Sequence, residues 1–283
     1  MARFLDRDCF RCYDGRKKGG DIVKKKLCCL MLALVLAVCT GCGYGQPLPD
    51  FDAVPGTIPA DSPRETAEAS CAPSSDVSLH CGIREDGSFD EHTLFVGDSL
   101  TFSLVAHYLK PQALAGDCRY AAKAGAAITA FFDPYIRMEY DESHNCLYSD
   151  GFYSLNMAQA AGAMGEDLHA FYFMMGTNFT EDASAQTYIE ICDYILESCP
   201  NATVFLQTVP YSPIVYYETV NQRIRDAYTY YQKQGEQRVL LIDTCQALGK
   251  DYLIGDQVHL SEEGREVWYQ ALLNYSIEHH IPQ

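Results

Sequence analysis

Short apolar runs alternate with longer amphipathic segments from about residue 92 to the carboxyl terminus. Continuous apolar runs are typical of parallel strands buried on both faces, and the longer segments have the 3.6-residue period of helices. We therefore expect an α/β domain in which helices cover both faces of a parallel sheet. Five strands are predicted, at Thr93–Val96, Arg119–Ala122, His169–Met175, Thr203–Val209 and Val239–Ile242.

Turn and capping residues delimit the helices between these strands. Pro200-Asn201 suits a turn after a helix, Gly235 suits a helix carboxyl cap, and Ser261 is a favoured N-cap for the last helix. Alternating strands and helices of this kind predict a flavodoxin-like, three-layer α/β/α sandwich. One further helix is predicted to begin at Asp98-Ser99 and to end near Leu109. The others are predicted at Ala126–Phe132, Ser154–Met164, Ala183–Glu197 and Val220–Gln234, and Asp133–Gly151 is expected to be irregular.

The first 42 residues have the pattern of an export signal. Lys24–Lys26 precede the apolar run Leu27–Val38, which is short for a membrane span but has the length of a signal-peptide core. The small residues before Cys42 resemble a bacterial lipobox, although Cys39 stands where an aliphatic residue is usual. The resemblance implies lipidation of Cys42 and an extracytoplasmic protein anchored to the cell membrane. An ordinary cleaved signal peptide and an uncleaved anchor are the alternatives.

Residues 43–90 are rich in Pro, Ser, Asp and Gly and have no sustained apolar period. We interpret them as a flexible linker between the membrane and a folded domain at residues 91–283. Residues 1–42 hold nine of the 21 Lys/Arg and four of the 38 Asp/Glu, so the remainder carries a net charge of −22. Such a surface repels nucleic acid and anionic lipid, so we expect no nucleic-acid partner.

Seven of the thirteen cysteines lie after residue 42, and an odd number cannot pair fully within one chain. Cys71 and Cys81 flank a short loop and are candidates for a disulfide bond. We expect most of the others to be buried as small apolar residues. No Cys/His group after residue 42 has the spacing of a zinc site, so no metal is expected.

Polar motifs follow four of the predicted strands. Gly97-Asp98-Ser99-Leu100 comes after the first, Gly125 after the second, Gly176-Thr177-Asn178 after the third and Asp256-Gln257-Val258-His259 after the last. Because the carboxyl ends of parallel strands meet at one edge of the sheet, we expect these motifs to converge there. Together they offer a nucleophile, oxyanion donors and a base with its orienting carboxylate, which are the groups an ester hydrolase needs.

These four motifs resemble those of the GDSL, or SGNH, hydrolase family, and the resemblance extends from about residue 92 to the end. It implies the SGNH hydrolase fold and a role for each matching residue. Ser99 would be the nucleophile and His259 the general base, with Asp256 orienting the imidazole ring. The backbone N–H groups of Ser99 and Gly125 and the side-chain amide of Asn178 would form the oxyanion hole.

Each role has a structural alternative. Ser99 is also a suitable helix N-cap, Asp256 and Gly125 suit turns, and Asn178 suits an ordinary loop. Phe179 stands where many relatives have Asp, and we expect it to form an apolar wall of the acyl pocket.

Two tyrosine-rich segments, Asp133–Gly151 and Tyr211–Tyr217, are predicted to shape the substrate cleft. Tyrosines beside polar groups suit stacking on carbohydrate and equally suit plain loops. Asp98 is expected to be structural, as it often is in such sites.

The sequence thus predicts an extracytoplasmic serine esterase that hydrolyses small acyl esters through an acyl-enzyme on Ser99. This route needs no metal or organic cofactor. Acetylated glycans, lysophospholipids and short-chain esters are all candidate substrates. The alternatives are O-acyl transfer to a sugar hydroxyl, a lysophospholipase or lipase, and a non-catalytic surface binding module on the same fold.

Overall fold

The computed structural model describes residues 78–136, 146–149, 151–279 and 281, which belong to the second of two compact units, Glu68–Gln283. The predicted signal peptide, the lipidation of Cys42 and residues 43–77 of the predicted linker lie outside the described residues. Cys71 also lies outside them, so its disulfide bond with Cys81 stays a prediction. Over the described ranges, no helix combines the length and apolar character needed to cross a bilayer.

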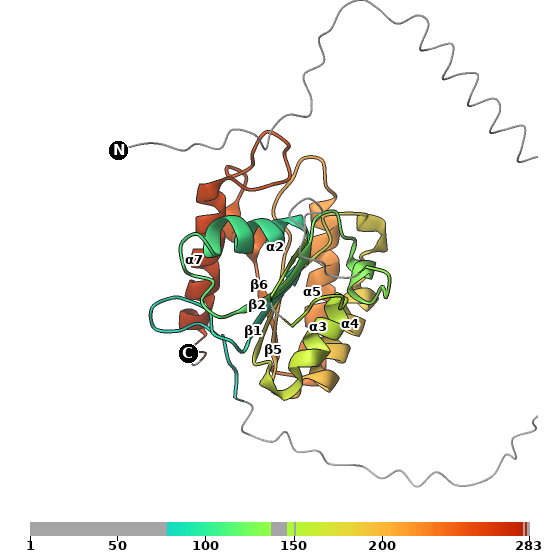
Figure 1. Cartoon of the computed structure of the whole chain (residues 1–283). Coiled ribbons are helices and arrows are strands. Elements are labelled where there is room, and N and C mark those ends of the chain that lie inside the picture. Colours follow the sequence, from blue (N-terminus) through green and yellow to red (C-terminus); the bar gives the residue numbers. More distant parts are fainter. Residues whose placement is uncertain (1–77, 137–145, 150, 280, 282–283) are drawn as a thin grey trace, which may run out of the picture. The chain divides into compact units, whose positions relative to one another are not determined.

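A twisted sheet forms the middle layer of the described domain (Figure 1), with its strands in the order β3-β2-β1-β4-β5-β6. All the strand pairs are parallel except β2 with β3, and the parallel strands have the order of a flavodoxin-like sheet, as predicted. The strands are β1 (Thr93–Gly97), β2 (Arg119–Lys123), β3 (Cys146–Tyr148), β4 (Ala170–Met174), β5 (Thr203–Gln207) and β6 (Val239–Ile242).

Helices cover both faces of the sheet, which confirms the three-layer prediction (Figure 1). One layer holds α2 (Ser99–Leu104) with its π-helical continuation (Val105–Leu109), α6 (Thr244–Leu248) and α7 (Glu262–Glu278). The opposite layer holds α3 (Met157–Met164), α4 (Ala185–Ser198) and α5 (Tyr217–Gln234). Single 3-10 turns lie at Ile128–Phe131, Gly165–Asp167 and Thr180–Asp182.

Local chemistry explains where the helices begin and end. The Ser261 hydroxyl accepts the Gly264 N–H at 3.1 Å and caps α7, as predicted. Asn156 and Gln159 form a capping box at the start of α3. Gly235 ends α5 with φ at +74°, a left-handed conformation in which glycine avoids the clash of a Cβ.

Two predicted segments were assigned the wrong secondary structure. The segment expected as a helix at Ala126–Phe132 forms only the 3-10 turn Ile128–Phe131. The segment Asp133–Gly151, expected to be irregular, contains β3, which pairs antiparallel with β2 through three residues. A strand this short has no readable alternation of apolar and polar positions. The short helix α6 was also not predicted.

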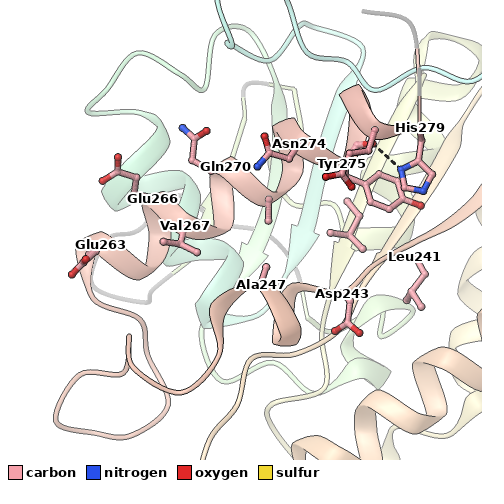
Figure 2. A pocket seen from close by; sticks show the side chains of 13 residues that line it. Leu241, Asp243, Ala247, Glu263, Glu266, Val267, Gln270, Asn274, Tyr275 and His279 are labelled. Carbon is pink, nitrogen blue, oxygen red and sulfur yellow. Dashed lines mark hydrogen bonds between the residues drawn. The ribbon is translucent and has the colours of Figure 1, made fainter.

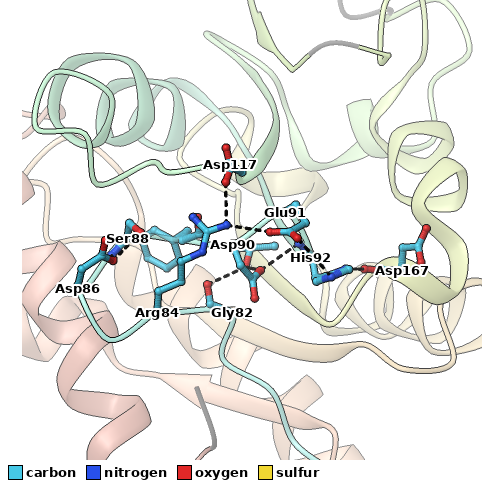
Figure 3. Close-up of polar contacts among 11 residues, drawn as sticks. Gly82, Arg84, Asp86, Ser88, Asp90, Glu91, His92, Asp117 and Asp167 are labelled. Atoms are coloured by element: carbon cyan, nitrogen blue, oxygen red, sulfur yellow. Dashed lines mark hydrogen bonds and ion pairs between the residues drawn. The ribbon is translucent and has the colours of Figure 1, made fainter.

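The folded domain begins earlier than the predicted boundary at residue 91, because residues 78–90 pack against the sheet. Cys81, Ile83 and Phe89 are fully or almost fully buried. The Tyr172 hydroxyl on β4 donates to the Cys81 carbonyl oxygen at 2.7 Å. Figure 3 shows that Arg84 lies between the carboxylates of Glu91 and Asp117, with each N···O distance at 2.8 Å. The apolar residues of this segment have neither the helical nor the strand period, so its packing against the sheet cannot be predicted from the sequence.

Three histidine rings lie together beside the amino ends of β1 and β4, where His92 stacks on His169 and His80 is tilted against it. The ring centroid of His169 lies 4.5 Å from that of His92 and 5.0 Å from that of His80. Nδ1 of His92 also meets the Asp167 carbonyl oxygen at 2.9 Å (Figure 3). Burial lowers the pKa of His169, and the charges of His92 and His80 act in the same direction against the opposing influence of Asp90 and Asp167.

We predict that the free energy of unfolding decreases as the pH falls below the ordinary histidine pKa of 6.5. The unfolded chain binds the His169 proton more readily, so the stability contributed by the neutral ring is complete above this pH and is lost below it. His169→Gln should flatten this part of a urea-unfolding pH profile, and His279→Gln, in a ring that stacks on Tyr275, is the control. An unchanged slope in the His169 variant would contradict the assignment.

Candidate active site

The register of the central strands brings three of the predicted motifs level with one another. Gly97 at the end of β1 lies opposite Ala122 on β2 and Met174 on β4. The residues that follow these three strands therefore emerge at the same edge of the sheet. Ser99, Gly125 and Asn178 all lie at this edge, beside the point where strand order reverses between β1 and β4.

The turn between β1 and α2 depends on a glycine with no room for a side chain. A Cβ on Gly97 would lie 2.5 Å from the Met174 carbonyl oxygen and would overlap the Thr101 hydroxyl. The close approach of these groups lets α2 begin directly at the carboxyl end of β1. Asp98, not Ser99, is the N-cap, because its Oδ1 accepts the Leu100 N–H at 3.0 Å. The N-cap alternative for Ser99 is therefore wrong.

Asp98 joins the loop after β1 to the loop after β4. Its buried carboxylate accepts the Thr177 hydroxyl at 2.6 Å and the Thr177 N–H at 3.4 Å. Burial raises the pKa of Asp98, while hydrogen bonds from Thr177 and Leu100 and the charge of a protonated His259 act to lower it.

The amide of Asn178 lies against the loop after β2. Its Nδ2 donates to the Ala126 carbonyl oxygen at 3.2 Å, which places the amide beside the Gly125–Ala126 turn. Gly125 has φ at +73°, and a Cβ there would meet no atom within 4 Å. This glycine is therefore favoured by its backbone conformation and faces open space. The structure thus brings two of the predicted oxyanion donors together.

Asp256 and His259 form a hydrogen-bonded pair on the loop before α7. Oδ2 of Asp256 lies 2.8 Å from Nδ1 of His259, and Oδ1 accepts the backbone N–H groups of Val258 and His259. Burial raises the pKa of Asp256, but these donors outweigh it and the net shift is downward. Asp256 is thus an ionised partner that holds a proton on Nδ1, which leaves Nε2 of His259 as the nitrogen able to accept one.

Two residues near the site have a left-handed backbone that side chains rarely adopt. Phe179, directly after Asn178, has φ at +48°, and Gln257, between Asp256 and His259, has φ at +64°. Such conformations persist where surrounding contacts impose them. The Ser212 hydroxyl holds Gln257 by donating to its carbonyl oxygen at 2.8 Å. Phe179 is 63% exposed, so its predicted role as a wall of the acyl pocket stays a prediction.

Three side chains that were not predicted from the sequence hold the site loops. The Thr177 hydroxyl binds Asp98, although only the glycine and asparagine of its motif were given roles. Arg223 on α5 donates to the carbonyl oxygens of Thr180 and Ala183, in the loop after Asn178. Arg265 on α7 bonds the carbonyl oxygen of Leu260, next to His259. No pattern in the sequence marks these arginines, because their partners are mostly backbone carbonyl oxygens, which every residue carries.

The described hollows lie away from these residues. One, of about 790 Å³, follows α7 between α6 and β6, and Glu263, Glu266, Gln270 and Asn274 line it along the helix (Figure 2). A second, of about 630 Å³, lies by Lys110, Gly116 and Ser149. None of the predicted site residues lines either one. Within the described ranges, no group of three His, Cys, Asp or Glu residues is arranged to hold a metal ion.

No family model matches the chain, and no curated protein matches it in sequence. Solved structures similar to it include the salicylyl-acyltransferase SsfX3 of a tetracycline biosynthetic pathway, at 14% identity and a TM-score of 0.48. The match covers 67% of this chain but only 55% of SsfX3.

Two further similar structures come from named bacteria. The catalytic domain of the peptidoglycan O-acetyltransferase of Streptococcus pneumoniae has 13% identity and a TM-score of 0.42, over 72% of this chain and 96% of that one. A Clostridium thermocellum family 3 carbohydrate esterase has 14% identity and a TM-score of 0.41, over 66% and 94%. Similarities this low do not determine the activity of this chain.

We predict that Thr177→Val destabilises the domain by about 1–3 kcal/mol, because the buried Asp98 carboxylate loses its shortest hydrogen bond. Thr177→Ser keeps the hydroxyl and should stay closer to the wild type. Urea unfolding of the three proteins measures the difference. A valine variant as stable as the wild type would show that the hydrogen bond contributes nothing to the fold.

Proposed function

We propose that this protein is a serine ester hydrolase of the GDSL/SGNH type that acts on small acyl esters. The observation that carries the proposal is the Asp256–His259 pair, with 2.8 Å between Oδ2 and Nδ1, on the loop between α6 and α7. Ser99 starts the helix after β1 at the same sheet edge, and the Asn178 amide lies beside the Gly125 turn. These are the parts of a serine acyl-transfer site, and they come from four separate segments of the chain.

In the proposed reaction, Nε2 of His259 accepts the Ser99 proton while Oγ attacks the ester carbonyl carbon. The Ser99 and Gly125 N–H groups and the Asn178 amide stabilise the resulting oxyanion. The carbon–oxygen bond to the alcohol then breaks, and His259 gives its proton to the departing alkoxide. Water, deprotonated by the same ring, attacks the acyl-enzyme and releases the acid and free Ser99. Asp256 stabilises the imidazolium at each step.

The exposure of these groups supports reaction with a substrate from solution. The His259 and Asp256 side chains are 35% and 48% exposed, while Ser99 is 9% exposed. The base is thus accessible, and the nucleophile is almost buried, which favours a short acyl group. Acetyl groups on glycans are the natural substrates we propose. With the export signal and Cys42, the proposal includes an extracytoplasmic, lipid-anchored enzyme.

We predict that residues 78–283 hydrolyse p-nitrophenyl acetate faster than longer-chain esters and that Ser99→Ala abolishes turnover without loss of folding. The serine oxygen is the attacking atom, so no other group replaces it. Ester hydrolysis and labelling by a fluorophosphonate measure the two parts of the prediction. Ser198→Ala, at the opposite end of the sheet, is the matched control.

A preference for octanoate would replace the small-acyl proposal with a lipase. Release of p-nitrophenol with acetyl transfer to an added sugar would favour the acyltransferase. If the folded protein shows neither ester turnover nor labelling of Ser99, the non-catalytic surface binding module is the remaining alternative.

Asn178→Ala should lower kcat for the best ester by about 10²–10³ with little change in KM, since the amide acts on charge that develops only in the transition state. Asn201→Ala is the control, because Asn201 also donates from its side-chain amide to a loop carbonyl, that of Glu166 at 2.8 Å, away from the site. Steady-state kinetics of both variants measure kcat and KM. Equal kcat values would remove Asn178 from the oxyanion hole.

A further inference from the structure

One arginine joins the helix of the proposed nucleophile to the loop of the proposed base. Nη1 of Arg265 on α7 donates to the Ser103 hydroxyl at 3.2 Å and to the Leu260 carbonyl oxygen at 2.8 Å. Ser103 lies four residues after Ser99, so both residues lie on the same face of α2. Leu260 directly follows His259. A single nitrogen thus bridges the two segments whose separation decides whether proton transfer is possible.

The position of Arg265 has a cost in stability. Its Nε is buried and has no hydrogen-bond partner, and burial lowers the pKa of the guanidinium against the opposing influence of Glu262. Ser103 is itself buried, at 9% exposure. A partly desolvated cation with an unpaired donor destabilises a domain unless its other contacts offset the loss. The contacts that Arg265 does make are those to Ser103 and Leu260, at the proposed site.

The other hydrogen bonds of this loop do not reach α2. Ser261 N–H donates to the Tyr252 carbonyl oxygen and Ile254 N–H donates to that of His259, so both bonds close the loop on itself. Ser212 fixes Gln257 from the loop after β5. Across the described part of the chain, we find no second hydrogen bond between α2 and the residues 252–278. The Arg265 bridge is therefore the polar connection between the two segments.

We infer that Arg265 is a positioning residue that fixes the separation of the Ser99 hydroxyl and the His259 ring. This inference rests on the proposed function of these two residues. Proton transfer requires heavy atoms within about 2.6–3.2 Å, and a displacement of about 1 Å can lower a rate by about 100-fold. Loss of the bridge lets α2 and the base loop move apart, so it reduces the rate of acylation rather than the affinity for substrate.

The test compares Arg265→Gln, Arg265→Lys and Ser103→Ala in the 78–283 domain, at a temperature where circular dichroism shows each variant folded. Arg265→Gln should lower kcat for p-nitrophenyl acetate about tenfold or more with KM within twofold. The rate constant for fluorophosphonate labelling of Ser99 should fall by the same factor. Lysine can still donate to Leu260 or Ser103 and should restore part of the rate. Arg238→Gln is the control, since Arg238 donates to the Pro200 carbonyl oxygen far from the site.

The kinetics of a double variant distinguish a positioning role of Arg265 from a general loss of packing. If Arg265 acts through Ser103, the Ser103→Ala and Arg265→Gln double variant should be no slower than Arg265→Gln alone, whereas independent effects would multiply. Ser103→Ala also removes only one hydroxyl, so it tests the bridge even if Arg265→Gln does not fold. Any one of three results overturns the inference. These are a kcat for Arg265→Gln no lower than that of Arg238→Gln, rate losses of the two single variants that multiply in the double variant, and a wild-type rate in Ser103→Ala. A wild-type protein without turnover or labelling refutes the proposed function itself, and this inference falls with it.

Discussion

The buried carboxylate of Asp98 is the constraint on which the arrangement of the site depends. It caps α2 through the Leu100 N–H and accepts the Thr177 hydroxyl at 2.6 Å, so one side chain ties together the loops that follow β1 and β4. Ser99 and Asn178 each lie one residue from these anchors. A buried carboxyl group is tolerated only where hydrogen-bond partners surround it, so movement of either loop would leave Asp98 unpaired. The relative position of nucleophile and amide is therefore fixed by a desolvation cost.

The proposed base is held differently from the proposed nucleophile. Asp256 and His259 lie on an exposed loop, and the residue Gln257 between them has a left-handed backbone conformation. Such a conformation is retained only if neighbouring contacts impose it. Ser212 supplies one contact from the loop after β5, and Arg265 supplies another from α7. The geometry of the proposed base thus depends on hydrogen bonds within an exposed loop, whereas that of Ser99 depends on the buried Asp98 carboxylate at the end of β1.

The sequence predicted the features that depend on local chemistry. Apolar runs located the parallel strands, Ser261 marked the start of α7, and Gly235 marked the end of α5. Features made by contacts distant in the chain were not predictable. The three-residue strand β3 forms only because β2 offers it an edge, and residues 78–90 have no periodic pattern although Cys81, Ile83 and Phe89 among them are buried. Likewise the motifs located Asp98 and Thr177, but not the bond between them.

The charge of the chain and the surface around the site favour the same class of substrate. Residues 43–283 carry a net charge of −22, which would repel a polyanion or an anionic bilayer, whereas an uncharged ester meets no such repulsion. Phe179, Ile214 and Tyr216 are exposed on the loops that follow β4 and β5, at the sheet edge where Ser99 lies, and Ile254 is exposed on the loop of Asp256 and His259. Apolar and aromatic side chains in this position can contact a neutral substrate at little desolvation cost. A neutral ester, such as an acetylated sugar, is therefore the substrate class that both the charge and these loops favour for the proposed esterase.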